Sequence, residues 1–152
     1  MSTLKVDKLQ GTSGSATALT LNGAASTFNG VHTVGNNAIY TSDGGAVTQN
    51  LVQGLAKAWV NFNGTGTIAA RDSFNVASLT DTATGNYTVN INNDFGAADY
   101  SVATNTQDLS GASNSQVVSL TASTTPLYTI TISPLVLADN PTVSVNCYGD
   151  LA

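Results

Sequence analysis

The residues that commonly carry catalysis are scattered through this chain. His32 is the sole histidine and Cys147 the sole cysteine of 152 residues. A serine or cysteine nucleophile requires a histidine base and an orienting acid beside it, and the Gly-x-Ser-x-Gly turn that presents a nucleophilic serine is absent from the sequence. Cys147 also lies on the apolar side of an alternating segment, which predicts a buried thiol. We therefore expect no enzymatic activity and no cofactor.

His32 is the single candidate for a metal ligand. If three copies of the chain met on a three-fold axis with His32 facing that axis, three imidazoles would converge on one point and hold a metal ion. A solvated or hydrogen-bonded histidine is the commoner role. The aspartates offer no calcium loop, because none of them begins an Asp-x-Asp-x-Asp-Gly pattern. Sequence alone cannot pair them as the two carboxylates of a glycosidase; a saccharide-degrading enzyme stays an alternative that the small chain disfavours.

One segment formally matches a nucleotide-binding pattern. Gly64, Gly66 and Ala69 satisfy Gly-x-Gly-x-x-Ala after an apparent strand. A dinucleotide site requires a helix to begin at that point, whereas the residues that follow have no helical stripe of apolar side chains. Asn63 and Gly64 instead indicate a tight turn between two antiparallel strands.

Composition and charge exclude two classes of partner. The net charge is -5, and the four basic residues, Lys5, Lys8, Lys57 and Arg71, do not cluster, so we expect no nucleic-acid surface. The longest run of apolar residues, 135–138, is far too short to span a bilayer, and the first residues carry no apolar signal core. We expect neither membrane insertion nor export. A surface rich in Ser, Thr and Asn without an export signal is typical of virion proteins, which are made in the host bacterial cytoplasm and released by lysis.

The chain is predicted to be all-β. Its nine acidic residues are all aspartate, and abundant Thr, Val, Tyr and Ile favour strands over helices. Apolar and polar residues alternate over five short segments, namely 58–62, 87–91, 100–102, 128–132 and 143–147. We expect residues 55–152 to form an antiparallel β-sandwich head.

The N-terminal third is too poor in apolar residues to fold by itself. Residues 11–54 are mostly Gly, Ser, Asn and Thr, so we predict a thin, extended, β-rich stem that gains a core when three copies wrap together. Residues 1–10 resemble a short strand, in which Leu4, Val6 and Leu9 would attach the chain to a larger particle. The predicted assembly is a homotrimer.

The segment AKAWVNFNGTGTIAARDSFNVASLTD (56–81), continued by GNYTVNI (85–91), resembles a domain near the C-termini of bacteriophage tail-fibre proteins, especially of phages that infect cyanobacteria and other marine bacteria. The opening STLKVDKL (2–9) resembles N-terminal segments of such virion proteins. The resemblance implies a trimeric virion appendage whose β-rich head contacts the host surface. Fibres of this family are commonly much longer. A short tail fibre, a spike-like accessory and a capsid-mounted fibre therefore all remain open.

These expectations define the candidate sites. Trp59, Arg71 and Asp72 are predicted to lie at a trimer interface or a surface contact, and for Trp59 interface packing is favoured over a glycan platform. Two polar loops are predicted to meet a host-surface glycan or protein, through Asn93, Asp94, Asp99, Ser113 and Asn114. The other partners would be virion proteins of the tail or capsid. The main alternative is a capsid decoration, head-fibre or fibre-attachment protein that binds no receptor.

Overall fold

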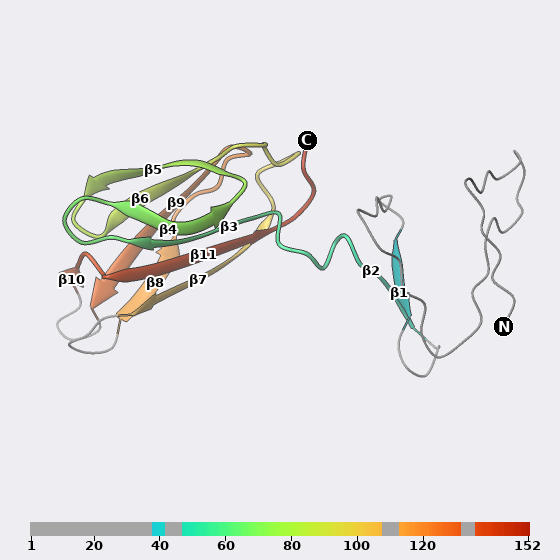
Figure 1. Cartoon of the computed structure of the whole chain (residues 1–152), viewed down its shortest axis with the longest axis horizontal. Helices are drawn as coiled ribbons and strands as arrows, with labels where there is room; N and C mark the ends of the chain where they lie inside the picture. The colour runs from blue at the N-terminus through green and yellow to red at the C-terminus, as the bar shows by residue number, and fades with distance from the viewer. Residues whose placement is uncertain (1–37, 42–46, 108–112, 132–135) are drawn as a thin grey trace, which may run out of the picture. The chain divides into compact units, whose positions relative to one another are not determined.

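The computed structural model describes residues 38–41, 47–107, 113–131 and 136–152 (Figure 1). Within these ranges every regular element is a β-strand, and all strand pairs are antiparallel. The all-β prediction is confirmed for this part of the chain. The attachment arm with Leu4, Val6 and Leu9, and the metal candidate His32, lie outside the described residues.

The predicted stem is described only near its end. Strand β1 (Ile39–Thr41) pairs with β2 (Thr48–Asn50) in a small two-stranded sheet. The amide of Leu51 donates a hydrogen bond to the carbonyl of Ala38 at 2.9 Å, which extends this pairing by one step.

The described residues between 58 and 152 form two larger sheets. The first sheet has the strand order β4 (Ala69–Phe74), β3 (Ala58–Asn63), β11 (Thr142–Tyr148), β7 (Ser101–Gln107). The second sheet has the order β10 (Val136–Leu137), β9 (Thr124–Thr131), β6 (Asn86–Ile91), β5 (Val76–Ala83), and β8 (Ser113–Val117) also pairs with β9. We call these residues the two-sheet unit.

The two sheets share one core because apolar residues alternate along their central strands. Burial alternates residue by residue in β3, β6 and β11, as the sequence pattern predicted for 58–62, 87–91 and 143–147. Phe62 of the first sheet and Tyr87 of the second meet edge to face, with ring centroids 5.2 Å apart and planes at 77°. The buried hydrophobic residues are Ala58, Val60, Phe62, Tyr87, Val89, Ile91, Phe95, Tyr100, Val143, Val145 and Cys147.

The turn between β3 and β4 confirms the hairpin interpretation of the Gly-x-Gly pattern. The side chain of Asn63 accepts hydrogen bonds from the amide and hydroxyl of Thr65 and donates one to its carbonyl. Gly66 adopts φ 65°, a left-handed conformation that glycine tolerates best. A strand follows where a dinucleotide site would need a helix.

Three strands escaped prediction. Strands β5, β8 and β10 lack alternation of apolar and polar residues, and β8 occupies part of the region predicted as a contact loop. Ser113 and Asn114 therefore lie in a strand, paired with Thr131 and Ile130 of β9. The prediction of a second polar loop through these two residues was wrong in that respect, because this segment pairs with β9 as a strand.

Backbone contacts define the two ends of the two-sheet unit. At the proximal end, where the chain enters from β2, the Lys57 amide donates to the Cys147 carbonyl at 2.8 Å, and the Ala152 amide donates to the Asp94 carbonyl at 2.9 Å. Loop 92–100 and the C-terminal residues 149–152 therefore lie at this end. At the distal end, the Gly64 amide donates to the Asn140 carbonyl at 2.9 Å. The described residues contain no helix of the length and apolar character that a membrane span requires.

Candidate functional site

The outer face of the first sheet carries side chains that alternate with the buried ones. Strand register aligns Phe74, Trp59, Asn146 and Ala103 in one row across the four strands. The next row toward the distal end aligns Asp72, Asn61, Ser144 and Asn105. Because paired strands lie about 4.8 Å apart, neighbours in a row are in reach of one ligand.

Three aromatic side chains gather on this face toward the proximal end. Phe74 is 55% exposed, and its cross-strand partner Trp59 is half-buried. Tyr148 is also half-buried and lies two residues beyond Asn146 on the same face of β11. Trp59 is the sole tryptophan of the chain. Aromatic rings with one exposed side present a flat apolar surface with a polar group at its edge.

The polar groups of the outer face fall into two sets. Asn61 is engaged within the sheet: its amide donates to Ser144 Oγ at 2.8 Å, and its carbonyl oxygen accepts from Arg71 at 3.2 Å. The side-chain amides of Asn105 and Asn146, by contrast, have no hydrogen-bond partner among the described residues, and neither does the indole N–H of Trp59. These groups keep their hydrogen-bonding capacity for solvent or a ligand.

Arg71 links strand β4 to backbone carbonyls of neighbouring segments. It occupies a β-bulge, since the register shifts by one residue between Asn61 and Phe62. Its guanidinium donates to the Phe62 carbonyl at 3.0 Å and to the Pro141 carbonyl. The neighbouring carboxylate of Asp72 accepts from the amide of Ser73 at 2.8 Å. The two predicted contact residues are thus adjacent in sequence but bond to different backbone groups.

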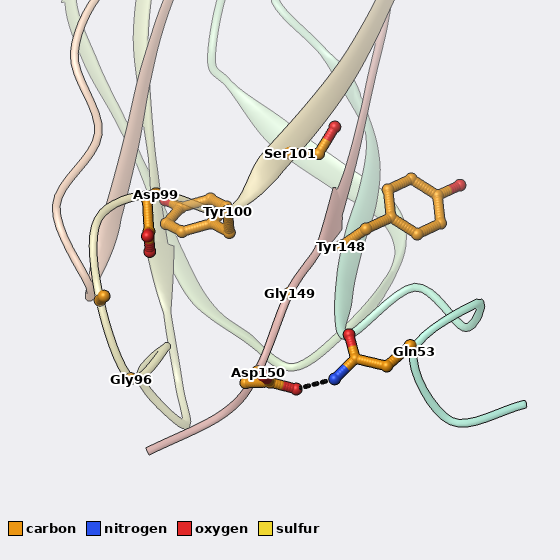
Figure 2. Close-up of a pocket in the computed structure, with 9 residues that line it drawn as sticks. Gln53, Gly96, Asp99, Tyr100, Ser101, Tyr148, Gly149 and Asp150 are labelled. Carbon is orange, nitrogen blue, oxygen red and sulfur yellow. Dashed lines mark hydrogen bonds between the residues drawn. The ribbon is translucent and has the colours of Figure 1, made fainter. Parts of the chain in front are cut away.

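A pocket of about 420 Å³ lies at the proximal end (Figure 2). The amide nitrogen of Gln53 donates to the Asp150 carboxylate across its mouth. Figure 2 shows the Tyr148 ring pointing away from Asp99 and Tyr100, so this ring belongs to the outer face. The pocket is lined by Gln53, Gly96, Ala97, Asp99, Tyr100, Ser101, Tyr148, Gly149 and Asp150.

The proximal pocket offers acceptors and hydroxyls without catalytic partners. Asp99 and Asp150 supply carboxylates, but its lining contains neither a histidine nor a cysteine. No group of three or more metal-ligating side chains occurs in the part of the chain that the structure describes. The pocket can therefore hydrogen-bond a polar group, and the described residues show no nucleophile and base brought together in it.

The predicted receptor residues do not converge. Asn93 is tied to the scaffold, because its amide and its side-chain nitrogen both donate to Asn75 Oδ1 at 2.8 Å. Asp94 and Asp99 are exposed in the same proximal loop. Asn114 is also exposed but lies in β8, whose first residues follow the distal end of β7. The two predicted contact regions therefore lie at opposite ends of the two-sheet unit.

Two titratable groups are buried beneath the proximal pocket. Burial raises the pKa of the Cys147 thiol and the pKa of the Tyr100 phenol, and the hydrogen bonds that each group shares with Thr125 partly oppose both increases. Tyr100 Oη lies 2.8 Å from Thr125 Oγ1, and Cys147 Sγ lies 3.7 Å from the same oxygen. A buried, protonated thiol is a poor nucleophile, and its burial confirms the orientation predicted from alternation.

Comparison with known proteins identifies no relative: no protein-family model, no curated protein and no solved structure matches this chain. The candidate surface accordingly rests on geometry. Sequence reasoning missed Phe74, Asn105, Asn146 and Tyr148 as its members. The signal was present, because the alternation that places Val143, Val145 and Cys147 in the core also places the intervening residues on the opposite face.

Proposed function

We propose that this chain is a structural protein of a bacteriophage virion: a short trimeric tail fibre, or a component of one, that attaches the particle to the host surface. Residues 55–152 form its β-sandwich head. The observation that carries the proposal is the outer face of the first sheet, where partly exposed aromatic rings lie beside amides that have no hydrogen-bond partner among the described residues. The all-β architecture and the resemblance of 56–91 to tail-fibre domains support it.

The core shared by the two sheets supports the proposed sandwich. Side chains of β3 and β11 from the first sheet and of β6 from the second are buried against one another, which is how two antiparallel sheets form a sandwich.

The trimeric stem is supported by apolar residues that the described part of the chain leaves uncovered. Ile39 is 65% and Val47 60% exposed, and Leu51 and Leu55 are also exposed. Four large apolar side chains in some twenty residues would gain by burial, at about 25 cal/mol per Å² of apolar surface removed from water. In the proposed trimer, the other two copies of the chain bury these side chains.

The direction of the chain selects the receptor-facing surface. Residues 53–57 enter the two-sheet unit at its proximal end, so in the proposed fibre the chain that leads to the attachment arm is joined to that end. Asn93, Asp94 and Asp99 lie at that end and are poorly placed to reach a host. Receptor contact in the proposed fibre therefore comes from the outer sheet face or the distal end.

A capsid-mounted fibre or decoration protein is the second candidate. Its support is the same all-β two-sheet unit, which a decoration protein can present equally well. This form of the proposal requires no receptor.

Immunogold electron microscopy tests the proposed function. An antibody raised against residues 55–152 is applied to purified phage particles that package the gene. Gold at the tail tip supports adhesion, and gold on the capsid supports the decoration form. Particles that carry no label after the antibody has been shown to detect the protein in the infected lysate would exclude a virion role.

A further inference from the structure

We propose that the outer face of the first sheet is a saccharide-binding site, in which Trp59 and Tyr148 stack on sugar rings and the amides of Asn146 and Asn105 bind their hydroxyls. The ligand class is a neutral pyranose saccharide of the host surface. This inference rests on the proposed adhesive function and assigns its contact to a surface that the loops predicted from sequence do not include.

The strand register gives the site its spacing. Asn146 lies directly opposite Trp59 on the neighbouring strand, so their Cβ atoms are about 5 Å apart. Tyr148 is the diagonal neighbour of Trp59, and diagonal positions on one face are separated by about 7–8 Å. A sugar ring seated on Trp59 therefore has the Asn146 amide at its edge, and an adjoining ring reaches Tyr148.

The chemistry of these groups matches a polyhydroxylated ring. A pyranose has an apolar face of C–H groups, which packs on an aromatic ring, and an edge of hydroxyls, each of which donates and accepts hydrogen bonds. Carboxamides also donate and accept, and those of Asn105 and Asn146 have no partner among the described residues. The indole N–H of Trp59 adds a further donor, which bonds to no group in the described ranges.

The electrostatics favour an uncharged ligand. Two cations lie near this face. The ammonium of Lys57, two residues before Trp59, donates to the carbonyls of Val52 and Leu55. The guanidinium of Arg71 donates to the carbonyls of Phe62 and Pro141 and to the side chain of Asn61. Asp72 in the adjoining row adds a negative charge. A polyanion would therefore have to compete with these carbonyl acceptors for both cations and would face the Asp72 carboxylate.

A second copy of the chain fits the face less well than a saccharide. Buried polar groups in a subunit interface require hydrogen-bond partners. The two amides that lack a partner among the described residues lie in adjacent rows, on β11 and on the edge strand β7. A self-complementary interface would have to satisfy both with the same kind of group. Hydroxyls of a sugar satisfy them without a repeat of the protein surface.

Trp59 reports on the site directly, because the emission of the sole tryptophan arises from this face. The probe is surface polysaccharide extracted from bacterial cells to which the purified full-length chain binds. The expected result is a saturable change in Trp59 emission, which disappears when periodate has cleaved the vicinal diols of the polysaccharide. Asn146→Ala and Tyr148→Ala should each weaken binding about 3- to 10-fold, since each removes contacts of about 1 kcal/mol.

Asn92→Ala is the matched control, because Asn92 is an exposed asparagine that lies outside the outer face of the first sheet. It should leave the affinity unchanged. If both Asn146→Ala and Tyr148→Ala bind cells as tightly as the wild type, the saccharide site is wrong and the adhesive function is still supported. A chain that binds no cells would overturn adhesion and this inference together. Dissociation of an oligomer on Trp59→Phe or Tyr148→Ala, followed by light scattering, would show that a second copy occupies the face.

Discussion

Asn75 joins three segments at the proximal end of the two-sheet unit. It stands between β4 and β5 with φ 56°, a conformation that asparagine tolerates better than most residues other than glycine. Its side-chain amide donates to the carbonyls of Lys57 and Asn93 at 3.0 Å, and its oxygen accepts both donors of Asn93. The corner between the two sheets thus depends on one side chain.

We expect Asn75→Ala to lower the free energy of unfolding by about 2–4 kcal/mol, from hydrogen bonds of about 1 kcal/mol each and a left-handed penalty of about 1 kcal/mol. Asn75→Gly should lower the free energy of unfolding by about 1 kcal/mol less than Asn75→Ala does. Glycine also loses the hydrogen bonds, but it adopts the left-handed conformation without the backbone penalty. Urea unfolding measures both, with Asn92→Ala as the exposed control. Equal stabilities of the Ala and wild-type proteins would contradict this role.

Two glycines of the β3–β4 turn should differ sharply in their response to alanine. A Cβ on Gly64 would lie 2.5 Å from Tyr87 Oη and 2.9 Å from the Asn140 carbonyl oxygen, whereas a Cβ on Gly66 meets nothing within 4 Å. Gly66→Ala should therefore lower the free energy of unfolding by about 1 kcal/mol, because alanine at this position meets no atom and is disfavoured only by the positive φ. Gly64→Ala should cost more, typically above 2 kcal/mol, because a close-packed interior cannot yield by half an ångström without strain.

The double variant Gly64→Ala/Tyr87→Phe identifies the cause of that cost. Removing the phenolic oxygen relieves the shortest contact but leaves the Asn140 carbonyl in place, so rescue should be partial. Thermal unfolding of the four proteins in the cycle measures the coupling. Strict additivity of the two changes would show that Gly64 does not act through Tyr87.

The buried thiol and phenol predict the alkaline limit of stability. Burial raises the pKa of Cys147 above its ordinary value of 9.0 and that of Tyr100 above 10.0. The folded state therefore keeps each proton to a higher pH than the unfolded chain. Their contribution is complete below pH 9.0, and stability falls as the pH rises above it, because the unfolded chain ionises first.

Cys147→Ala should move the onset of that alkaline loss toward the ionisation of Tyr100. Chemical unfolding at a series of pH values from 7 to 11 follows the change. An unaltered alkaline profile in the variant would show that the thiol does not ionise on unfolding in this range. A constant offset between the two proteins below pH 9.0 is expected, since the substitution also leaves a small cavity.

Strand β4 shows how an exposed element is held at a sheet edge. All six of its residues are exposed, so little apolar burial fixes it to β3. Arg71 compensates by bonding the carbonyls of Phe62 and Pro141. We expect Arg71→Ala to destabilise the protein by about 1–3 kcal/mol, the range of hydrogen bonds to charged groups.

The acceptors of these Arg71 hydrogen bonds are neutral carbonyls, so the interaction is not an ion pair. Added salt should change its contribution little, in contrast with an exposed salt bridge. Asp72→Asn is the matched change at the neighbouring position and should stay within about 0.5 kcal/mol of wild type. A strong loss of stability in Asp72→Asn that disappears at high salt would instead favour an Arg71–Asp72 pair.

Alternation in the sequence predicted the central strands and failed at the edges, for a physical reason. Strand β3 buries every second residue, so burial imposes a period of two on its sequence. Strand β5 is largely exposed along its length, and exposure on both faces imposes no such period. The residues of the outer face could be predicted from the alternation in β3 and β11. The roles of Asn75 and Arg71 were not, because each depends on carbonyls brought from distant segments.

For the whole molecule, the buried core is formed within residues 58–147, while the described residues before it expose most of their large apolar side chains. The two-sheet unit should therefore fold by itself, and the N-terminal third should drive assembly.

We expect the full chain to sediment and scatter light near three times 15.4 kDa. The fragment 55–152 should run as a monomer and unfold in one cooperative transition, since its core is intact. A full-length monomer would contradict the shared stem. A trimeric fragment would instead place the subunit contacts on the two-sheet unit, where the exposed edge strand β4 and the outer face of its sheet are available for pairing.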